Sequence, residues 1–200
     1  MAEATPDLKP EMTEAEIGVL RECFSKAASL VEFGSGGSTL MAVRNRTLRH
    51  IWSVESDPGW IARLREQPDI VGAEQAGRLH MQGVDIGTAG DYGYPRDHAM
   101  QANWPRYYQT IWDNPGATAT DLVLIDGRFR VACALEALVR CQPHTILLFH
   151  DFWNRTPYHP VLAFTDWLGS CDSLAILRRK PELDAQKLEA VRKAHRLQPD

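Results

Sequence analysis

LVEFGSGGSTL, residues 30–40, passes within a few positions from apolar side chains to glycine and serine. Its first part is typical of a buried strand, and one acidic residue, Glu32, lies inside it. Glycine and serine contribute little packing inside a strand, so we expect residues 34–38 to form a turn. A turn of this composition is typical of a site where a ligand approaches the backbone closely.

Composition restricts the class of protein. The chain has 200 residues, 44% hydrophobic and 24% charged, as expected for one globular domain over residues 1–200. Its net charge of −4 favours no nucleic-acid partner, and no apolar run is long enough to cross a membrane. The acidic N-terminus does not resemble a signal peptide, and the four cysteines show no CxxC spacing. We therefore expect a cytoplasmic protein, with a homodimer left open.

Strand and helix patterns alternate along the chain. Strands are expected over residues 29–33, 50–55, 78–85, 121–126, 144–151 and 173–180, within a core of residues 28–180. Helices are expected over 13–27, 38–45, 57–67, 130–141, 158–169 and 182–196, with Thr13, Ser38 and Asp57 as N-caps. This order predicts an α/β fold, a doubly wound and mostly parallel sheet with helices on both faces, of Rossmann-like type.

Residues 87–118 interrupt the alternation. The segment carries glycine, proline and aromatic residues without a clear period, which is typical of a lid or binding loop. We expect this segment to cover the side of a binding site where a substrate lies, and to become ordered on binding. Tyr94 and Trp104 would form part of the wall of that site.

Polar residues end five of the predicted strands. They are Glu32, Glu55, Asp85, Asp126 and the pair His150–Asp151. In doubly wound sheets, ligands bind outside the carboxyl ends of the strands. The sequence therefore predicts a site at this edge.

The glycine turn narrows the choice of ligand. It lacks the GK[ST] of a P-loop, and it matches the dinucleotide fingerprint only in part because Thr39 replaces the third glycine. Glu32 would repel a pyrophosphate but can anchor a cation, whereas Glu55 can accept hydrogen bonds from ribose hydroxyls. S-adenosyl-L-methionine (SAM) has a ribose, a positive charge and no phosphate.

Four stretches in order, VEFGSGGST, SVESD, DLVLIDG and LLFHDF, carry a family resemblance over residues 28–152. The chain resembles class I SAM-dependent methyltransferases, in particular the small bacterial group related to catechol- and macrocin-type O-methyltransferases. The resemblance implies a transferase with SAM as cofactor, acting on the oxygen of a small molecule.

The resemblance and the positions of the residues give a set of candidate site residues. The candidates for binding the cofactor are Glu32, Gly34, Ser35, Gly36, Gly37, Ser38, Glu55, Ser56, Asp85 and Ile86. Asp126, His150 and Asp151 are the catalytic candidates, with His150 the best candidate for a base. Tyr94, Trp104, Arg128 and Arg130 are the substrate candidates, the two arginines for an anionic acceptor.

Departures from the family pattern leave alternatives open. Phe129 and Val131 stand where related sequences have histidine and tyrosine. Asp126 and Asp151 match the two acids of metal-dependent members, but Phe152 stands where Asn or Asp completes the set, so we expect no metal. A SAM-binding relative without catalysis and an NAD-dependent oxidoreductase that binds the NAD ribose through Glu55 remain the alternatives.

Overall fold

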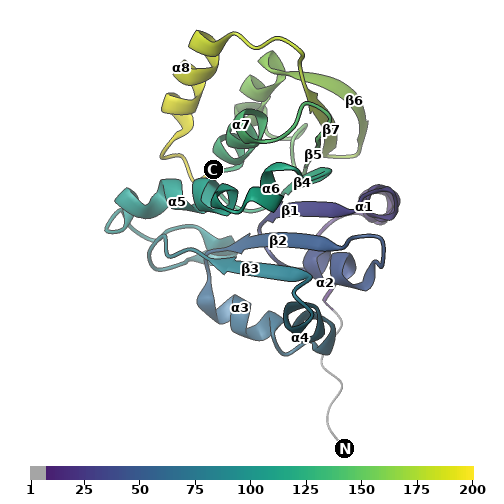
Figure 1. Ribbon diagram of the computed structural model, residues 1–200. Coiled ribbons are helices and arrows are strands. Elements are labelled where there is room, and N and C mark those ends of the chain that lie inside the picture. Colours follow the sequence, from purple (N-terminus) through teal and green to yellow (C-terminus); the bar gives the residue numbers. More distant parts are fainter. Residues whose placement is uncertain (1–7) are drawn as a thin grey trace, which may run out of the picture.

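The predicted strands pair into one sheet in the computed structural model, which describes residues 8–200. Over those residues the sheet has seven strands in the order β3-β2-β1-β4-β5-β7-β6 (Figure 1). The strands are β1 (Ser29–Phe33), β2 (His50–Glu55), β3 (Leu79–Gly83), β4 (Leu122–Ile125), β5 (Ile146–Phe149), β6 (Thr165–Cys171) and β7 (Leu174–Arg179). Strands β1 to β5 are parallel, and β7 runs antiparallel to both β5 and β6. The mostly parallel, doubly wound fold is confirmed.

Helices cover both faces of this sheet (Figure 1). They are α1 (Glu14–Lys26), α2 (Gly37–Arg44), α3 (Pro58–Leu64), α4 (Pro68–Gln75), α5 (Trp104–Gln109), α6 (Pro115–Thr118), α7 (Arg130–Arg140) and α8 (Ala185–His195). Successive strand side chains point to opposite faces, so each strand contributes to two cores. Leu30 packs in a cluster with α1, α2 and α4, whereas its neighbour Val31 packs in a cluster with α5 to α8.

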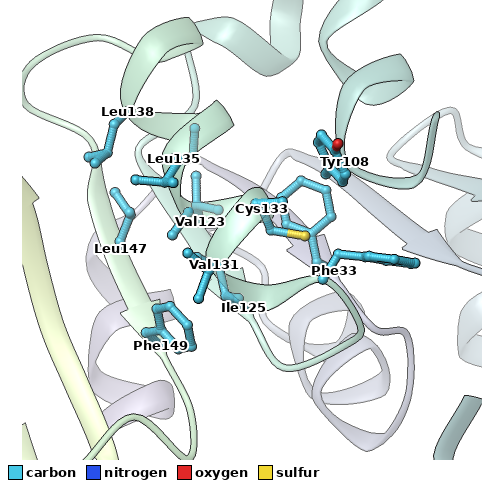
Figure 2. Close-up of a cluster of buried hydrophobic side chains, with 14 of the residues drawn as sticks. Phe33, Tyr108, Val123, Ile125, Val131, Cys133, Leu135, Leu138, Leu147 and Phe149 are labelled. Atoms are coloured by element: carbon cyan, nitrogen blue, oxygen red, sulfur yellow. The ribbon is translucent and has the colours of Figure 1, made fainter. Parts of the chain in front are cut away.

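The core beneath α7 anchors the loops that follow β4 and β5. Figure 2 shows Val131 and Leu135 of α7 close to Val123 of β4 and Leu147 of β5. All four side chains are fully or almost fully buried. Burial of side chains of this size contributes roughly 1.5–3 kcal/mol each, so the two strand ends have a rigid foundation.

Two of the three predicted helix caps are confirmed. Thr13 forms a capping box with Glu16, and the Asp57 carboxylate accepts hydrogen bonds from two backbone N–H groups at the start of α3. The expectation for Ser38 was wrong. Helix α2 begins at Gly37 with Gly36 at the N-cap, and the Ser38 hydroxyl donates to the carboxylate of Glu32 instead.

Two elements differ from the sequence prediction. The helix expected over 158–169 is wrong: a 3₁₀ helix over Thr156–Ala163 leads directly into the edge strand β6. Pro160 has no backbone N–H for a regular helix, and pairing with β7 makes the following residues extended. Helix α4 was not predicted; it begins with Pro68, a favourable first helical residue.

The segment over residues 87–118 divides into two parts. From Trp104 onward it forms α5, a 3₁₀ turn and α6, and Trp104, Tyr107 and Trp112 are at most 5% exposed. Figure 2 shows Tyr108 of this part near Phe33 of β1 and Cys133 of α7. These aromatic side chains are packed in the core, so residues 104–118 are not a lid that lies free of the core. Ordering of the segment on binding stays a prediction.

Candidate functional site

A cavity of about 620 Å³ lies at the carboxyl ends of β1, β2, β4 and β5. Its wall consists of the turn after β1, the residues after β2, the segment 90–94, and the loops after β4 and β5. Strand order reverses between β1 and β4, because the chain continues from β1 to β2 on one side and from β4 to β5 on the other. The cavity therefore occupies the switch point where doubly wound sheets bind ligands.

The glycine turn owes its shape to close backbone contacts. Gly34 has a φ of +93°, and a Cβ atom there would lie 2.6 Å from the Cα of Gly127. The turns after β1 and β4 thus touch through two glycines. A Cβ on Gly36 would meet nothing within 4 Å, so the turn leaves its backbone open to a ligand there. Gly34, Ser35, Gly36, Gly37 and Ser38 all line the cavity, as predicted for a ligand-binding turn.

Glu32 lies beneath this turn and not in the cavity. It is fully buried, and its carboxylate accepts hydrogen bonds from the hydroxyls of Ser38 at 2.5 Å, Thr39 at 2.5 Å and Ser53 at 2.6 Å. Burial raises the pKa of Glu32 to about 7, although these three hydroxyls oppose the shift. The structure therefore gives Glu32 internal partners in place of the direct ligand contact expected from sequence.

Glu55 lies at the end of β2 and lines the cavity. Its Oε2 accepts from the backbone N–H of Ser35 at 3.1 Å, and its Oε1 accepts from those of Ser56 at 2.6 Å and Asp57 at 3.0 Å. Burial raises its pKa above the usual value, against these backbone hydrogen bonds. The carboxylate is held rigidly beside the glycine turn, and Ser56 also lines the cavity.

Three further predicted site residues lie outside the cavity wall, as Glu32 does. Asp85 accepts a hydrogen bond from the backbone of Gly87 at 2.9 Å, in a local turn. Ile86 is fully buried, and its carbonyl accepts from the indole of Trp104 at 2.9 Å. The predictions that Asp85 and Ile86 border the ligand and that Trp104 contacts a substrate therefore have no support in this geometry. Tyr94 does line the cavity.

Asp126 and His150 form a pair at the ends of β4 and β5. His150 Nδ1 lies 2.8 Å from Asp126 Oδ1, and His150 Nε2 lies 3.5 Å from Oε2 of Glu16. Burial alone would lower the pKa of His150, but Asp126, Asp151 and Glu16 outweigh it and raise that pKa. Carboxylates face both ring nitrogens, so the histidine supports Asp126 and is poorly placed as a free base. Within residues 8–200 no hydrogen bond reaches Oδ2 of Asp126, and Asp126 lines the cavity.

Arg130 connects the two strand ends. Its Nη2 lies 3.3 Å from Asp126 and its Nη1 lies 3.2 Å from Asp151, while Nη1 also donates to the His150 carbonyl and Nε to the Gly127 carbonyl. Burial would raise the pKa of Asp151, but Arg130, with His150 and Arg155, lowers it below the usual value. Among residues 8–200 no group of three or more His, Cys, Asp or Glu side chains is arranged to hold a metal ion.

Arg128 also lines the cavity and is 6% exposed. Its guanidinium carbon lies 4.1 Å from the centre of the Tyr94 ring. Between the two arginines, Phe129 has a left-handed φ of 54° and buries its ring against Tyr107 and Trp104. This turn of the backbone gives the two arginines different surroundings.

Sequence reasoning missed several parts of the wall. Residues 8–11 cross the glycine turn, and a Cβ on Gly37 would lie 2.1 Å from the carbonyl carbon of Lys9. Trp60 lines the cavity and donates its indole N–H to the Ser35 carbonyl at 2.7 Å. Arg155 lines the cavity on the side of β5. Only Trp60 had a usable sequence signal, because it lies in the first turn of the helix that follows Glu55.

Comparisons with known proteins agree with this arrangement. A crystal structure of a methyltransferase-like protein from Silicibacter pomeroyi matches with a TM-score of 0.84 and 29% identity, over 96% of this chain and 98% of that one. A Staphylococcus aureus protein assigned as a caffeoyl-CoA O-methyltransferase matches with a TM-score of 0.59 and 9% identity, over 86% of each chain. An N-methyltransferase from Bradyrhizobium japonicum, in complex with S-adenosyl-L-homocysteine (SAH), matches with a TM-score of 0.52 and 13% identity, over 87% of this chain and 89% of that one.

No protein-family model matches the sequence, and a search of curated proteins gives no match. The similarity to known proteins is therefore one of structure, and the Silicibacter pomeroyi protein adds 29% sequence identity. No helix within residues 8–200 has the length and apolar character needed to cross a membrane. The chain therefore has the fold of class I SAM-dependent methyltransferases.

Proposed function

We propose that the cavity binds SAM and that the protein transfers its methyl group to a hydroxyl oxygen of a small molecule. The observation that carries the proposal is the meeting of three groups in one cavity: the open glycine turn, the Glu55 carboxylate and the Asp126 carboxylate. The cavity volume of about 620 Å³ is in the range of small-molecule sites.

The residues present fit SAM. Bound SAM supplies a methyl group on a positively charged sulfur. The backbone around Gly36 is open, and Glu55 is fixed beside it to accept hydrogen bonds from ribose hydroxyls. Glu32, through Ser38 and Thr39, holds the shape of the turn from below, and we propose this indirect role in place of direct contact.

Asp126 is the residue we propose to act on the acceptor. Its Oδ1 is held by His150 and Arg130, which fixes the carboxylate, while Oδ2 is available to the cavity. A hydroxyl that donates to Oδ2 would have its oxygen oriented for attack, and its proton could pass to the carboxylate as the new C–O bond forms. His150 and Asp151 position Asp126 through their charges and through Arg130.

The remaining features of the proposal concern partners and compartment. The acceptor is a small molecule and not a nucleic acid, in line with the negative net charge of −4. All four cysteines are free, which supports a reducing compartment such as the cytoplasm.

The test is methyl transfer from labelled SAM to a panel of hydroxyl and amine acceptors, with wild type and Asp126→Asn. We expect the hydroxyl acceptors to be methylated, and the variant to lose about a hundredfold or more in kcat, the usual range for general acid–base groups. SAH affinity should stay unchanged, because Asp126 acts on the acceptor. Methylation of amines alone, or full activity of Asp126→Asn, would contradict the proposal.

A further inference from the structure

Arg128 carries hydrogen-bond donors that the protein leaves unused. Its guanidinium lines the cavity although the residue is 6% exposed, and Nη1 donates to the main-chain oxygen of Asp200 at 3.0 Å. Among residues 8–200, neither its Nε nor its Nη2 has a hydrogen-bond partner. A charged group in such surroundings is stabilised by a partner that brings acceptor oxygens.

The other arginines in the cavity wall are already engaged. Arg130 distributes its donors among Gly127, His150, Asp126 and Asp151. Arg155 donates to Asp151 at 3.0 Å and to the Tyr158 hydroxyl at 3.3 Å. Arg130 cannot turn to a ligand without breaking its ion pairs to Asp126 and Asp151 in a buried site, which is costly. Arg155 is 41% exposed and therefore better hydrated, so it gains less from a new partner than a buried guanidinium does. This separates Arg128 from Arg130, although the sequence presents them as equivalent.

The guanidinium of Arg128 is held in place for recognition. The Tyr94 ring stacks on it at 4.1 Å, a cation–π contact that keeps the flat group oriented. Gly93 lies beside the arginine side chain, where a Cβ would make ordinary van der Waals contact with the Cγ of Arg128 at 4.0 Å. A planar, oriented guanidinium with two unused nitrogens matches the geometry of a carboxylate or a phosphate.

We propose that Arg128 binds an oxyanion, a carboxylate or a phosphate, carried by the methyl acceptor. The inference rests on the proposed function, because it assigns the acceptor side of the same cavity. Arg128 follows Asp126 by two positions at the end of β4, so an acceptor with its hydroxyl on Asp126 and its oxyanion on Arg128 is held at two points. Two-point binding fixes the orientation of the attacking oxygen.

The negative charge of Asp200 weakens the attraction of this site for an anion. Its side-chain oxygen accepts from the backbone N–H of Arg130 at 3.0 Å, and its main-chain oxygen accepts from Arg128. An incoming oxyanion therefore meets a like charge beside the guanidinium. Removal of that charge should strengthen the binding of an anion.

The experiment uses three probes of similar shape: benzoate, phenyl phosphate and the neutral benzyl alcohol. Each is titrated calorimetrically into the full chain, with and without saturating SAH. The variants are Arg128→Gln, Asp200→Asn and the control Arg106→Gln, which removes the same charge from an exposed position on α5 outside the cavity wall.

We expect benzoate or phenyl phosphate to bind the wild type and benzyl alcohol to bind more weakly. Arg128→Gln should weaken the anion by roughly tenfold or more, as expected for loss of a charge-assisted hydrogen bond. Arg106→Gln should leave the affinity unchanged, and Asp200→Asn should raise it. The relative strength of the two anions indicates which oxyanion the acceptor carries.

Equal binding of the anions to wild type and Arg128→Gln, or no anion binding in any variant, would overturn this inference. An Asp200→Asn variant that binds the anions no better than wild type would also count against it, even if Arg128→Gln fails to fold. Failure of SAH to bind is a separate result, which would contradict the proposed function and not the oxyanion site.

Discussion

Arg130 neutralises two carboxylates that come from different strands. It lies 3.3 Å from Asp126 and 3.2 Å from Asp151, and it is 4% exposed. The guanidinium already supplies the positive charge that two neighbouring acids require in a buried site. A divalent ion at this point would have to compete with an arginine that cannot lose its charge.

The first prediction follows from this contact. Addition of Mg²⁺ should change neither the melting temperature of the protein with SAH nor its methyl-transfer rate with SAM. EDTA should have no effect on either quantity. Differential scanning fluorimetry and the labelled-SAM assay measure the two quantities. A saturable rise of either with Mg²⁺ that EDTA reverses would show that a metal displaces Arg130.

The second prediction concerns the buried acid beneath the glycine turn. The folded-state pKa of Glu32 is raised from 4.5 to about 7, so folding favours its protonated form. The contribution of protonated Glu32 to the free energy of unfolding is present below pH 4.5 and is lost as the pH rises to about 7. The free energy of unfolding then falls by up to about 1.4 kcal/mol per pH unit. Glu32→Gln should remove this part of the pH dependence of unfolding.

Urea unfolding at several pH values between about 4.5 and 8 tests the second prediction. The control is Glu66→Gln, an exposed acid, which should keep the slope of the wild type. An identical pH dependence in wild type and Glu32→Gln would mean that Glu32 is ionised in the folded protein across this range.

Residue types at the strand ends could be predicted from sequence more reliably than their contacts. Glu55, Asp126 and Asp151 all line the cavity, because the strands before them end at one edge of a parallel sheet. Glu32 is turned inward by Ser53, its direct neighbour across β1 and β2. Asp85 follows β3, an edge strand outside the four strands whose ends form the cavity, and only the strand order reveals this.

At the scale of elements, a strap over residues 8–11 closes one side of the cavity. It crosses the start of α2 so closely that a Cβ on Gly37 would lie 2.1 Å from the Lys9 carbonyl carbon and 2.3 Å from the Pro10 nitrogen. These neighbours are backbone atoms that cannot rotate away. Glycine at position 37 is therefore a condition for the strap to lie where it does.

The third prediction is that Gly37→Ala lifts the strap. Hydrogen exchange in residues 8–12 of the ligand-free protein should become faster, while exchange in α8 should stay as in the wild type. Gly36→Ala is the matched control, because a Cβ there meets nothing within 4 Å. Equal exchange in both variants would mean that the strap does not depend on this contact.

Elements with strong local patterns were predicted well, and those defined by tertiary pairing were not. The strands β1, β2, β4 and β5 are largely apolar and buried, and the predicted ranges of all five parallel strands include the observed ones. Strand β6 exposes Trp167 and Leu168, so its pattern is not that of a buried strand, and pairing with β7 defines it. The aromatic residues of 104–112 lack a clear period because they fill a concave core between α7 and the sheet.

At the scale of the whole molecule, the sheet order explains why one cavity collects the polar residues. The chain turns back at the junction of β1 and β4, and the loops after these strands touch through Gly34 and Gly127. Strand β2, next to β1, brings Glu55 to one side of the cavity, and β5, next to β4, brings His150 to the other side. The same architecture appears in the Silicibacter pomeroyi protein at a TM-score of 0.84.

The most direct test of SAM binding is a calorimetric titration of the protein with SAH and, separately, with NAD. We expect one saturable SAH site, a stabilisation of about 2.7 kcal/mol at one hundred times the dissociation constant, and no comparable response to NAD. Glu55→Gln should weaken SAH by about 1.5–3 kcal/mol, the range for hydrogen bonds to a charged group, while Glu66→Gln should leave it unchanged. Tighter binding of NAD than of SAH, or SAH binding that ignores Glu55, would contradict the assignment of this cavity to SAM.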